Sequence, residues 1–188
     1  MPTGYQIKNQ DYPHFLTLQI VEWVDIFTRQ VYRNIIVDAL NFCINQKQLI
    51  VYGYVIMSNH VHLIAQSSNN NLSATIRDFK SFTSKEMLKY IETGIESRDE
   101  WMLNIFKKAA LKHKRNSNYQ VWTHENHALE VHSYQFFRSK LDYLHANPIR
   151  AGIVKNAEDY LYSSATNYAG ENGLVQVEIA TLPWKTIS

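Results

Sequence analysis

Cysteine is nearly absent from this sequence, because its 188 residues contain only Cys43. A single cysteine excludes an intrachain disulfide. It also provides no second thiolate for the zinc sites that proteins build from several cysteines. Cys43 lies in the apolar stretch IIVDALNFCI, and this context predicts a buried thiol with a packing role.

Long apolar runs are missing as well. No stretch approaches the roughly 18 consecutive apolar residues of a membrane-spanning helix, so no membrane partner is expected. The first residues, MPTGYQIKNQDYPHF, lack the basic and then apolar pattern of a signal peptide. We therefore expect a cytoplasmic protein.

Neither sign of charge dominates, since the formal net charge is +2. Apolar residues make up 45% of the chain and charged residues 19%, which is typical of a folded domain and not of a disordered chain. The length suits a single domain, which we take as residues 1–188. A mildly basic balance permits a polyanionic partner without requiring one.

The first half of the chain alternates between β and helical patterns. Residues 14–23, HFLTLQIVEW, are rich in β-forming residues and predict a strand, and residues 28–47 continue with a helical period. Two β segments follow at 49–57 and 61–66. The turn-forming residues SNH join them, so they predict a hairpin with His60 at the start of its second strand.

The second half is mainly helical. Residues 69–91 predict a helix that begins at Asn and Ser cap candidates, and residues 93–118 predict a helix followed by a basic loop. A further helix is expected at 132–148, stopped by Pro148, and a late strand at 173–179. This order predicts an α+β fold, an antiparallel sheet with helices packed on one face, in a ferredoxin-like or RRM-like arrangement.

Two histidines separated by one residue lie within the apolar run YVIMSNHVHLIAQ, at 54–66. The two-residue period of a strand places His60 and His62 on one face, while Val61 and Leu63 point to the other. Two neutral imidazoles on a rigid strand favour a metal site. The alternative is a structural or surface pair with no ligand.

A second group of polar residues lies in the segment LDYLHANPIRAGIV, at 141–154. Tyr143 and Asn147 are four residues apart, so a phenol and a carboxamide share one helical face. If that face covers His60 and His62, a nucleophile and a third oxygen ligand meet at one metal. Taken alone, the tyrosine is more simply a packing residue and Asn147 a helix terminator before proline.

Together, these segments resemble the HUH single-tyrosine transposases, and in particular the REP-associated tyrosine transposase branch. The resemblance extends over roughly residues 14–170. Its segments are GYVIMSNHVHLI, LSATIRDFKSFTSK, VWTHENHALEV, DYLHANPIRAGIV and EDYLYSSATNY.

The resemblance implies an enzyme that nicks and rejoins single-stranded DNA, including DNA with hairpin elements. It implies that Tyr143 is the catalytic nucleophile and forms a 5′-phosphotyrosine intermediate. It also implies a divalent metal, Mg²⁺ or Mn²⁺, with His60, His62 and Asn147 as ligands. Such a ligand set leaves positions for DNA oxygens and water. The sequence leaves open a monomer or a homodimer that exchanges the tyrosine helix.

Basic side chains provide candidates for contacts with DNA phosphates. Lys80, within FKSF, is the first of these, and Arg150, just after the tyrosine helix, is the second. Three further candidates come from the basic run between 107 and 115: Lys112, Lys114 and Arg115. The alternative for most of these residues is the solvated face of an amphipathic helix.

Two other functional classes are alternatives to the transposase. A nucleotide hydrolase of the histidine-triad type needs a third alternating histidine, and this chain has Ile64 there. A non-catalytic relative that binds DNA hairpins would keep the fold and the basic surface. The joint presence of His60, His62, Tyr143 and Asn147 favours the catalytic reading.

Overall fold

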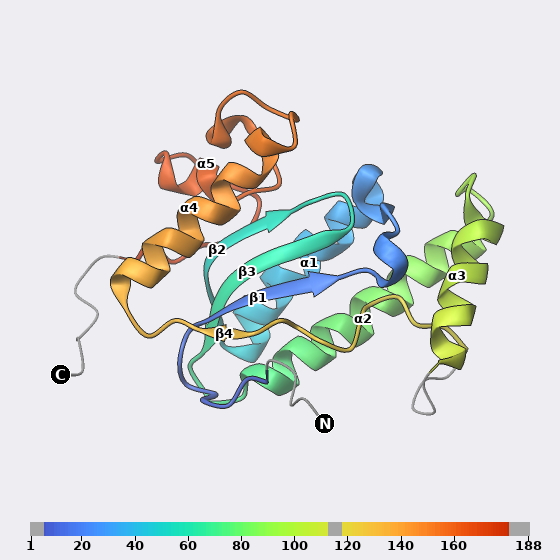
Figure 1. The fold of residues 1–188 in the computed structure, drawn as a ribbon, viewed down its shortest axis with the longest axis horizontal. Helices are drawn as coiled ribbons and strands as arrows, with labels where there is room; N and C mark the ends of the chain where they lie inside the picture. The colour runs from blue at the N-terminus through green and yellow to red at the C-terminus, as the bar shows by residue number, and fades with distance from the viewer. Residues whose placement is uncertain (1–5, 113–117, 181–188) are drawn as a thin grey trace.

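The computed structural model describes residues 6–112 and 118–180, which form a four-stranded antiparallel sheet in the order β2-β3-β1-β4 (Figure 1). The central strands are β1 (His14–Gln19) and β3 (His60–Ser67), with β2 (Leu49–Ile56) and β4 (Leu129–Glu130) outside them. This order, with helices after β1 and β3, is that of a ferredoxin-like fold. The predicted α+β class is confirmed.

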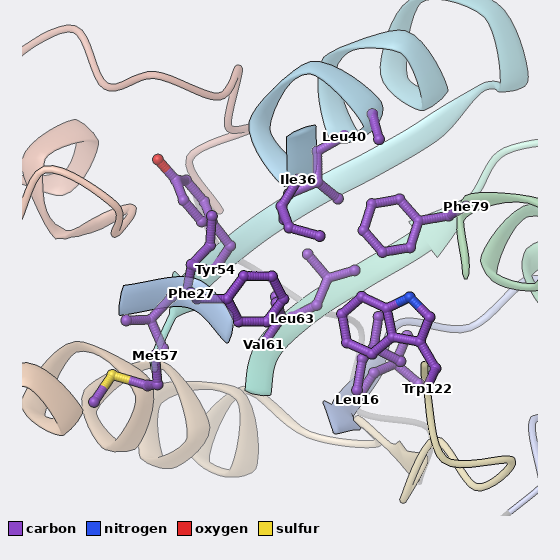
Figure 2. Close-up of a cluster of buried hydrophobic side chains, with 14 of the residues drawn as sticks. Leu16, Phe27, Ile36, Leu40, Tyr54, Met57, Val61, Leu63, Phe79 and Trp122 are labelled. Atoms are coloured by element: carbon purple, nitrogen blue, oxygen red, sulfur yellow. The ribbon is translucent and has the colours of Figure 1, made fainter. Parts of the chain in front are cut away.

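One face of the sheet is covered by α1 (Gln30–Lys47) and α2 (Leu72–Glu92) (Figure 1). Alternate residues of the strands, such as Leu16 and Leu63, point to these helices and are fully buried (Figure 2). They meet apolar residues of α1 and α2, among them Ile36 and Phe79. The two-residue period therefore directs the intervening residues of the same strands, including His60 and His62, to the opposite face.

That opposite face carries a helix of its own, α4 (Tyr134–Arg150). The contact is close at Gly53 of β2, where an added Cβ would lie 2.8 Å from Leu141 Cδ1 and 3.4 Å from Leu144 Cδ2. The absence of a side chain at Gly53 thus allows α4 to approach the sheet. The sequence predicted helices on one face of the sheet. The structure has α1 and α2 on that face and α4 on the second face.

The remaining described elements are two helices and three short turns outside the sheet. The helices are α3 (Asp99–Leu111) and α5 (Ala165–Tyr168), and the 3-10 turns are η1 (Val21–Trp23), η2 (Ile26–Thr28) and η3 (Ala157–Asp159).

Among the described residues, no helix has both the length and the apolar character needed to cross a membrane.

The predicted late strand at 173–179 is wrong, because the fourth strand is instead the two-residue β4, which precedes α4 in the chain. The outer edge of β2 is already bonded by an earlier segment. Ile56 N donates to Tyr162 O and Ser164 N to Tyr54 O, each over 2.9 Å. Residues 173–179 make one bond to this edge, from Glu178 N to Val51 O over 2.8 Å, next to the irregular register between Val51 and Gly53.

The first strand ends earlier than predicted, at Gln19 and not at residue 23. Residues 21–23 form η1, in which Glu22 and Trp23 have φ angles of 51° and 56°. Such left-handed backbone cannot continue a strand. A run of β-forming residues therefore ends in a tight turn.

Pro148 does not stop the last long helix, contrary to the prediction, since α4 runs to Arg150. Proline removes one backbone bond, the one that would reach the Leu144 carbonyl. The next turn is still closed by a bond from Ala151 N to Asn147 O over 2.9 Å. Gly152, with φ of 69°, adopts the left-handed conformation that commonly ends a helix.

A buried carboxylate fixes the segment before α3, and we expect its removal to destabilise the fold. The side chain of Glu96 is fully buried, lies 3.2 Å from Arg29 and 3.3 Å from Arg98, and accepts a 3.0 Å bond from the Tyr32 hydroxyl. Glu96→Ala leaves that buried hydroxyl unpaired, so the free energy of unfolding should fall by about 3 kcal/mol. Urea denaturation measures it.

The control is Glu92→Ala, which removes an exposed carboxylate from the end of α2. It should change the free energy of unfolding by less than about 0.5 kcal/mol. Equal effects of the two substitutions would contradict a stabilising role for Glu96.

Candidate active site

His60 and His62 lie side by side on β3, on the face of the sheet away from the main core. The register pairs His62 with Thr17 and His60 with Gln19 on β1. The centroids of the two imidazole rings are 4.6 Å apart. Both histidines come from a central strand, so their relative position is fixed by the sheet on either side.

Hydrogen bonds on Nδ1 orient both imidazoles. His60 Nδ1 lies 2.7 Å from Asn59 Oδ1, while Asn59 Nδ2 donates to the Trp23 carbonyl over 3.4 Å. This arrangement makes Asn59 Oδ1 the acceptor of the His60 Nδ1 proton, and Nε2 then carries a lone pair. His62 Nδ1 lies 2.9 Å from Thr17 Oγ1. Among the described residues, neither Nε2 atom has a hydrogen-bond partner.

Burial favours the neutral form of both imidazoles. Desolvation lowers the pKa of His60 below its usual range. It also lowers the pKa of His62 to about 3, with smaller effects from His60, Arg150 and Lys140. Neutral imidazole is the form that binds a metal ion, so neither histidine needs to lose a proton near neutral pH.

Tyr143 reaches the same place from α4. Its ring centroid lies 5.4 Å from that of His62 and 6.0 Å from that of Phe15. The side chain remains 42% exposed, so a substrate can approach the phenol. The structure thus brings Tyr143 and the two histidines together, although they lie about 80 residues apart in the sequence.

Asn147 and Arg150 both bond the backbone of the tyrosine. Asn147 Nδ2 and Arg150 Nη2 each donate to the Tyr143 carbonyl oxygen over 3.0 Å. The Arg150 guanidinium also lies over the Tyr143 ring, 4.6 Å from its centroid. Asn147 makes no hydrogen bond to His60 or His62. Its Oδ1 keeps its lone pairs, because the amide nitrogen is the atom bonded to the helix.

Lys140 also lies at this site and was not identified from the sequence. Its Nζ atom is 5.8 Å from the centroid of the Tyr143 ring, 5.2 Å from that of Phe15 and 5.1 Å from that of Phe136. It forms no ion pair with a described carboxylate. Lys140 precedes Tyr143 by three residues, and this helical spacing was the available signal. His145, by contrast, points away and bonds Ser164 Oγ over 2.8 Å.

Of the other basic candidates, Lys80 lies away from the histidines. Lys80 is on α2, against the opposite face of the sheet, and its Nζ donates to Thr123 O and Asn126 Oδ1 over 2.7 Å each. Burial lowers the pKa of Lys80 to about 8. The residue lines a groove of about 560 Å³. Lys112 pairs with Glu22 over 2.8 Å, while Lys114 and Arg115 lie outside the described residues.

The donor atoms fit a divalent ion held by few protein ligands. Within residues 6–112 and 118–180, no three His, Cys, Asp or Glu side chains form a group able to hold a metal. The available set is two imidazole nitrogens and, one helical turn after Tyr143, an amide oxygen. This set suits Mg²⁺ or Mn²⁺ with further positions open to water and substrate oxygens.

Known proteins resemble this chain in sequence and in fold. Residues 16–134, more than half of the chain, match the family described as "Transposase IS200 like". A solved structure of a REP-associated tyrosine transposase bound to a REP hairpin has a similar fold, with a TM-score of 0.56 and 16% identity. The match covers 97% of this chain and 94% of that one. No curated protein sequence matches. The chain belongs to the IS200-like transposase family.

Proposed function

We propose that this chain is a metal-dependent endonuclease and strand transferase for single-stranded DNA, acting through a covalent 5′-phosphotyrosine intermediate. One observation carries the proposal: the Tyr143 ring lies 5.4 Å from that of His62, which is 4.6 Å from His60. A phenol next to two neutral imidazoles with unoccupied Nε2 atoms is suited to attack on a phosphodiester. The family match supports the same reaction class.

The reaction uses the hydroxyl of Tyr143 as the nucleophile. Its oxygen forms a bond to phosphorus while the bond from phosphorus to the 3′ oxygen breaks. The phenolic proton passes to solvent, and the departing 3′ oxygen takes up a proton to become a free 3′-hydroxyl. Reversal of the same step, with another 3′-hydroxyl as attacker, joins strands without an external energy source. In this proposal, residues 1–188 act as a single domain of the HUH endonuclease type.

We assign the metal to His60 and His62, with the Asn147 amide oxygen as the third protein ligand. When bound, Mg²⁺ or Mn²⁺ would supply Lewis-acid polarisation of the scissile phosphate. The two imidazoles are already oriented for metal binding, because Thr17 and Asn59 form hydrogen bonds with their Nδ1 atoms. Partners of this kind orient metal-binding imidazoles and raise their affinity.

Two cations next to Tyr143 would contact the phosphate. Lys140 forms no ion pair with a described carboxylate, and Arg150 uses one of its N–H groups on the Tyr143 carbonyl, so the others remain for phosphate oxygens. Lys80, Lys112, Lys114 and Arg115 stay assigned to more distant phosphates. A DNA substrate also supports the expected cytoplasmic location.

We propose that one chain supplies the whole site. The Tyr143 ring lies 5.4 Å from that of His62 in the same protomer, which supports a site assembled without exchange of α4 between two copies. The relative of known structure was bound to a REP hairpin, and we therefore propose single-stranded DNA with a hairpin as the substrate.

The test is covalent capture. The protein is incubated with a pool of labelled oligonucleotides, each with a hairpin between random single-stranded arms, in Mg²⁺, in Mn²⁺ or in EDTA. We expect a labelled protein adduct on a denaturing gel with either metal and none with EDTA. Sequencing of the captured strands gives the cleavage site. Binding without any adduct would overturn the proposal in favour of a hairpin-binding protein, and an adduct in EDTA would overturn the metal assignment.

A further inference from the structure

An exposed tryptophan lies at the end of the site opposite to Tyr143. Trp23 is 61% exposed, although it sits between Val21 and Val24, which are buried. Its ring centroid is 6.4 Å from that of His60, at an interplanar angle of 83°. The proposed chemistry leaves this large aromatic surface unused.

The backbone holds Trp23 in place at an energetic cost. Trp23 and Glu22 both have left-handed φ angles, 56° and 51°. Bulky side chains rarely adopt this conformation, and it clusters at functional sites. The turn is tied to the rest of the fold, because Val21 N donates to Val121 O over 2.9 Å, and it is closed by a bond from Trp23 N to Ile20 O over 3.2 Å. The fold therefore determines where the backbone of Trp23 lies.

Asn59 connects the tryptophan to the site. Its Nδ2 donates to the Trp23 carbonyl, and its Oδ1 accepts the His60 Nδ1 proton. The residue that orients the imidazole thus also ties down the turn that carries the indole. Neighbouring ring centroids from Trp23 through His60 and His62 to Tyr143 are separated by 6.4, 4.6 and 5.4 Å. Trp23 and Tyr143 therefore flank the histidine pair.

We propose that Trp23 is a base-stacking subsite for the unpaired nucleotide immediately 5′ to the scissile phosphate. The inference rests on the proposed function. In an in-line displacement, the leaving oxygen departs on the side of phosphorus opposite to the nucleophile. With Tyr143 at one end of the site, the nucleotide that keeps the 3′ oxygen extends toward the other end, where the exposed indole lies. Stacking on an aromatic ring is how proteins commonly hold unpaired bases.

The test measures stacking without cutting. Tyr143→Phe protein in EDTA is titrated with captured oligonucleotides that carry 2-aminopurine at successive single-stranded positions. We expect Trp23-dependent quenching of the fluorescence at the position just 5′ of the mapped cut. An abasic site there should weaken binding about tenfold with Trp23 present, and should have almost no effect after Trp23→Ala. Trp23→Phe should retain most of the affinity.

The matched control is Trp101→Ala, which removes another exposed indole, 49% exposed, from α3. Trp101 has no ring contact with the site, so this variant should bind and quench like the parent protein. Thermal melts of each variant check folding. Equal abasic penalties with and without Trp23, or Trp23-dependent quenching on the 3′ side of the cut, would overturn the subsite.

The two proposals fail in different ways. A normal adduct together with no Trp23-dependent quenching overturns the base subsite and leaves strand cutting intact. The absence of any adduct from the wild-type protein overturns the proposed function. It then also overturns the assignment of Trp23 to the nucleotide 5′ of the cut, because that assignment depends on cleavage.

Discussion

Tyr143→Phe is expected to abolish the covalent adduct and strand cleavage while leaving DNA binding intact. The substitution removes one oxygen from a side chain whose hydroxyl makes no hydrogen bond with a described residue. The ring contacts with His62 and Phe15 do not depend on that oxygen. Loss of the attacking atom should reduce the cleavage rate by at least about a thousandfold, as when other covalent nucleophiles are removed. Single-turnover cleavage and gel capture provide the measurement.

Tyr134→Phe is the matched control, because Tyr134 begins the same helix and stacks on Phe137. It should form the adduct at the wild-type rate. Unaltered thermal melting of both variants would show that only chemistry has changed. An adduct that survives Tyr143→Phe would refute the assignment and require a different nucleophile.

His62→Ala should have the second largest effect, through loss of the metal. His62 is almost fully buried, with 5% of its surface exposed, and contacts Thr17 and Tyr143, so its removal takes away one of the two proposed imidazole ligands from inside the site. We expect Mn²⁺ binding to become undetectable in titration calorimetry and metal-dependent cleavage to fall at least about a hundredfold. His60→Ala should behave similarly.

A graded variant separates metal binding from general damage. Thr17→Val keeps the shape of the side chain but removes the partner of His62 Nδ1, so Mn²⁺ affinity should fall by about 10 to 100 times and high Mn²⁺ should restore cleavage. His132→Ala, which removes an exposed imidazole, should leave Mn²⁺ binding unchanged. Full Mn²⁺ affinity in His62→Ala would show that the metal lies elsewhere.

The sequence predicted the parts of the site that follow from local periodicity. A two-residue period was enough to place His60 and His62 on one face of a strand. A four-residue spacing put Tyr143 and Asn147 on one turn of helix. Their meeting across the fold depended on the family resemblance, because no local pattern shows which face α4 presents to the sheet. The close approach at Gly53, which allows that packing, is visible only in three dimensions.

Other features depended on contacts that the sequence does not encode locally. Trp23 looked like the end of a strand, yet the backbone turns left-handed at Glu22 and presents the indole to solvent. Lys80 looked like an outward cation, but its amine bonds Thr123 and Asn126, which are more than 40 residues away. The last strand was misplaced because the edge of β2 was already bonded by residues 162–164.

The bonds along β2 also bear on how copies of this protein can associate. An open strand edge recruits further strands and promotes aggregation. Here Tyr54 and Ile56 bond residues 162–164, and Val51 bonds Glu178. The opposite margin of the described sheet is a strand of only two residues, β4. Strand addition is therefore disfavoured at both margins of the described sheet, which favours assembly on DNA through side-chain surfaces or through the nucleic acid itself.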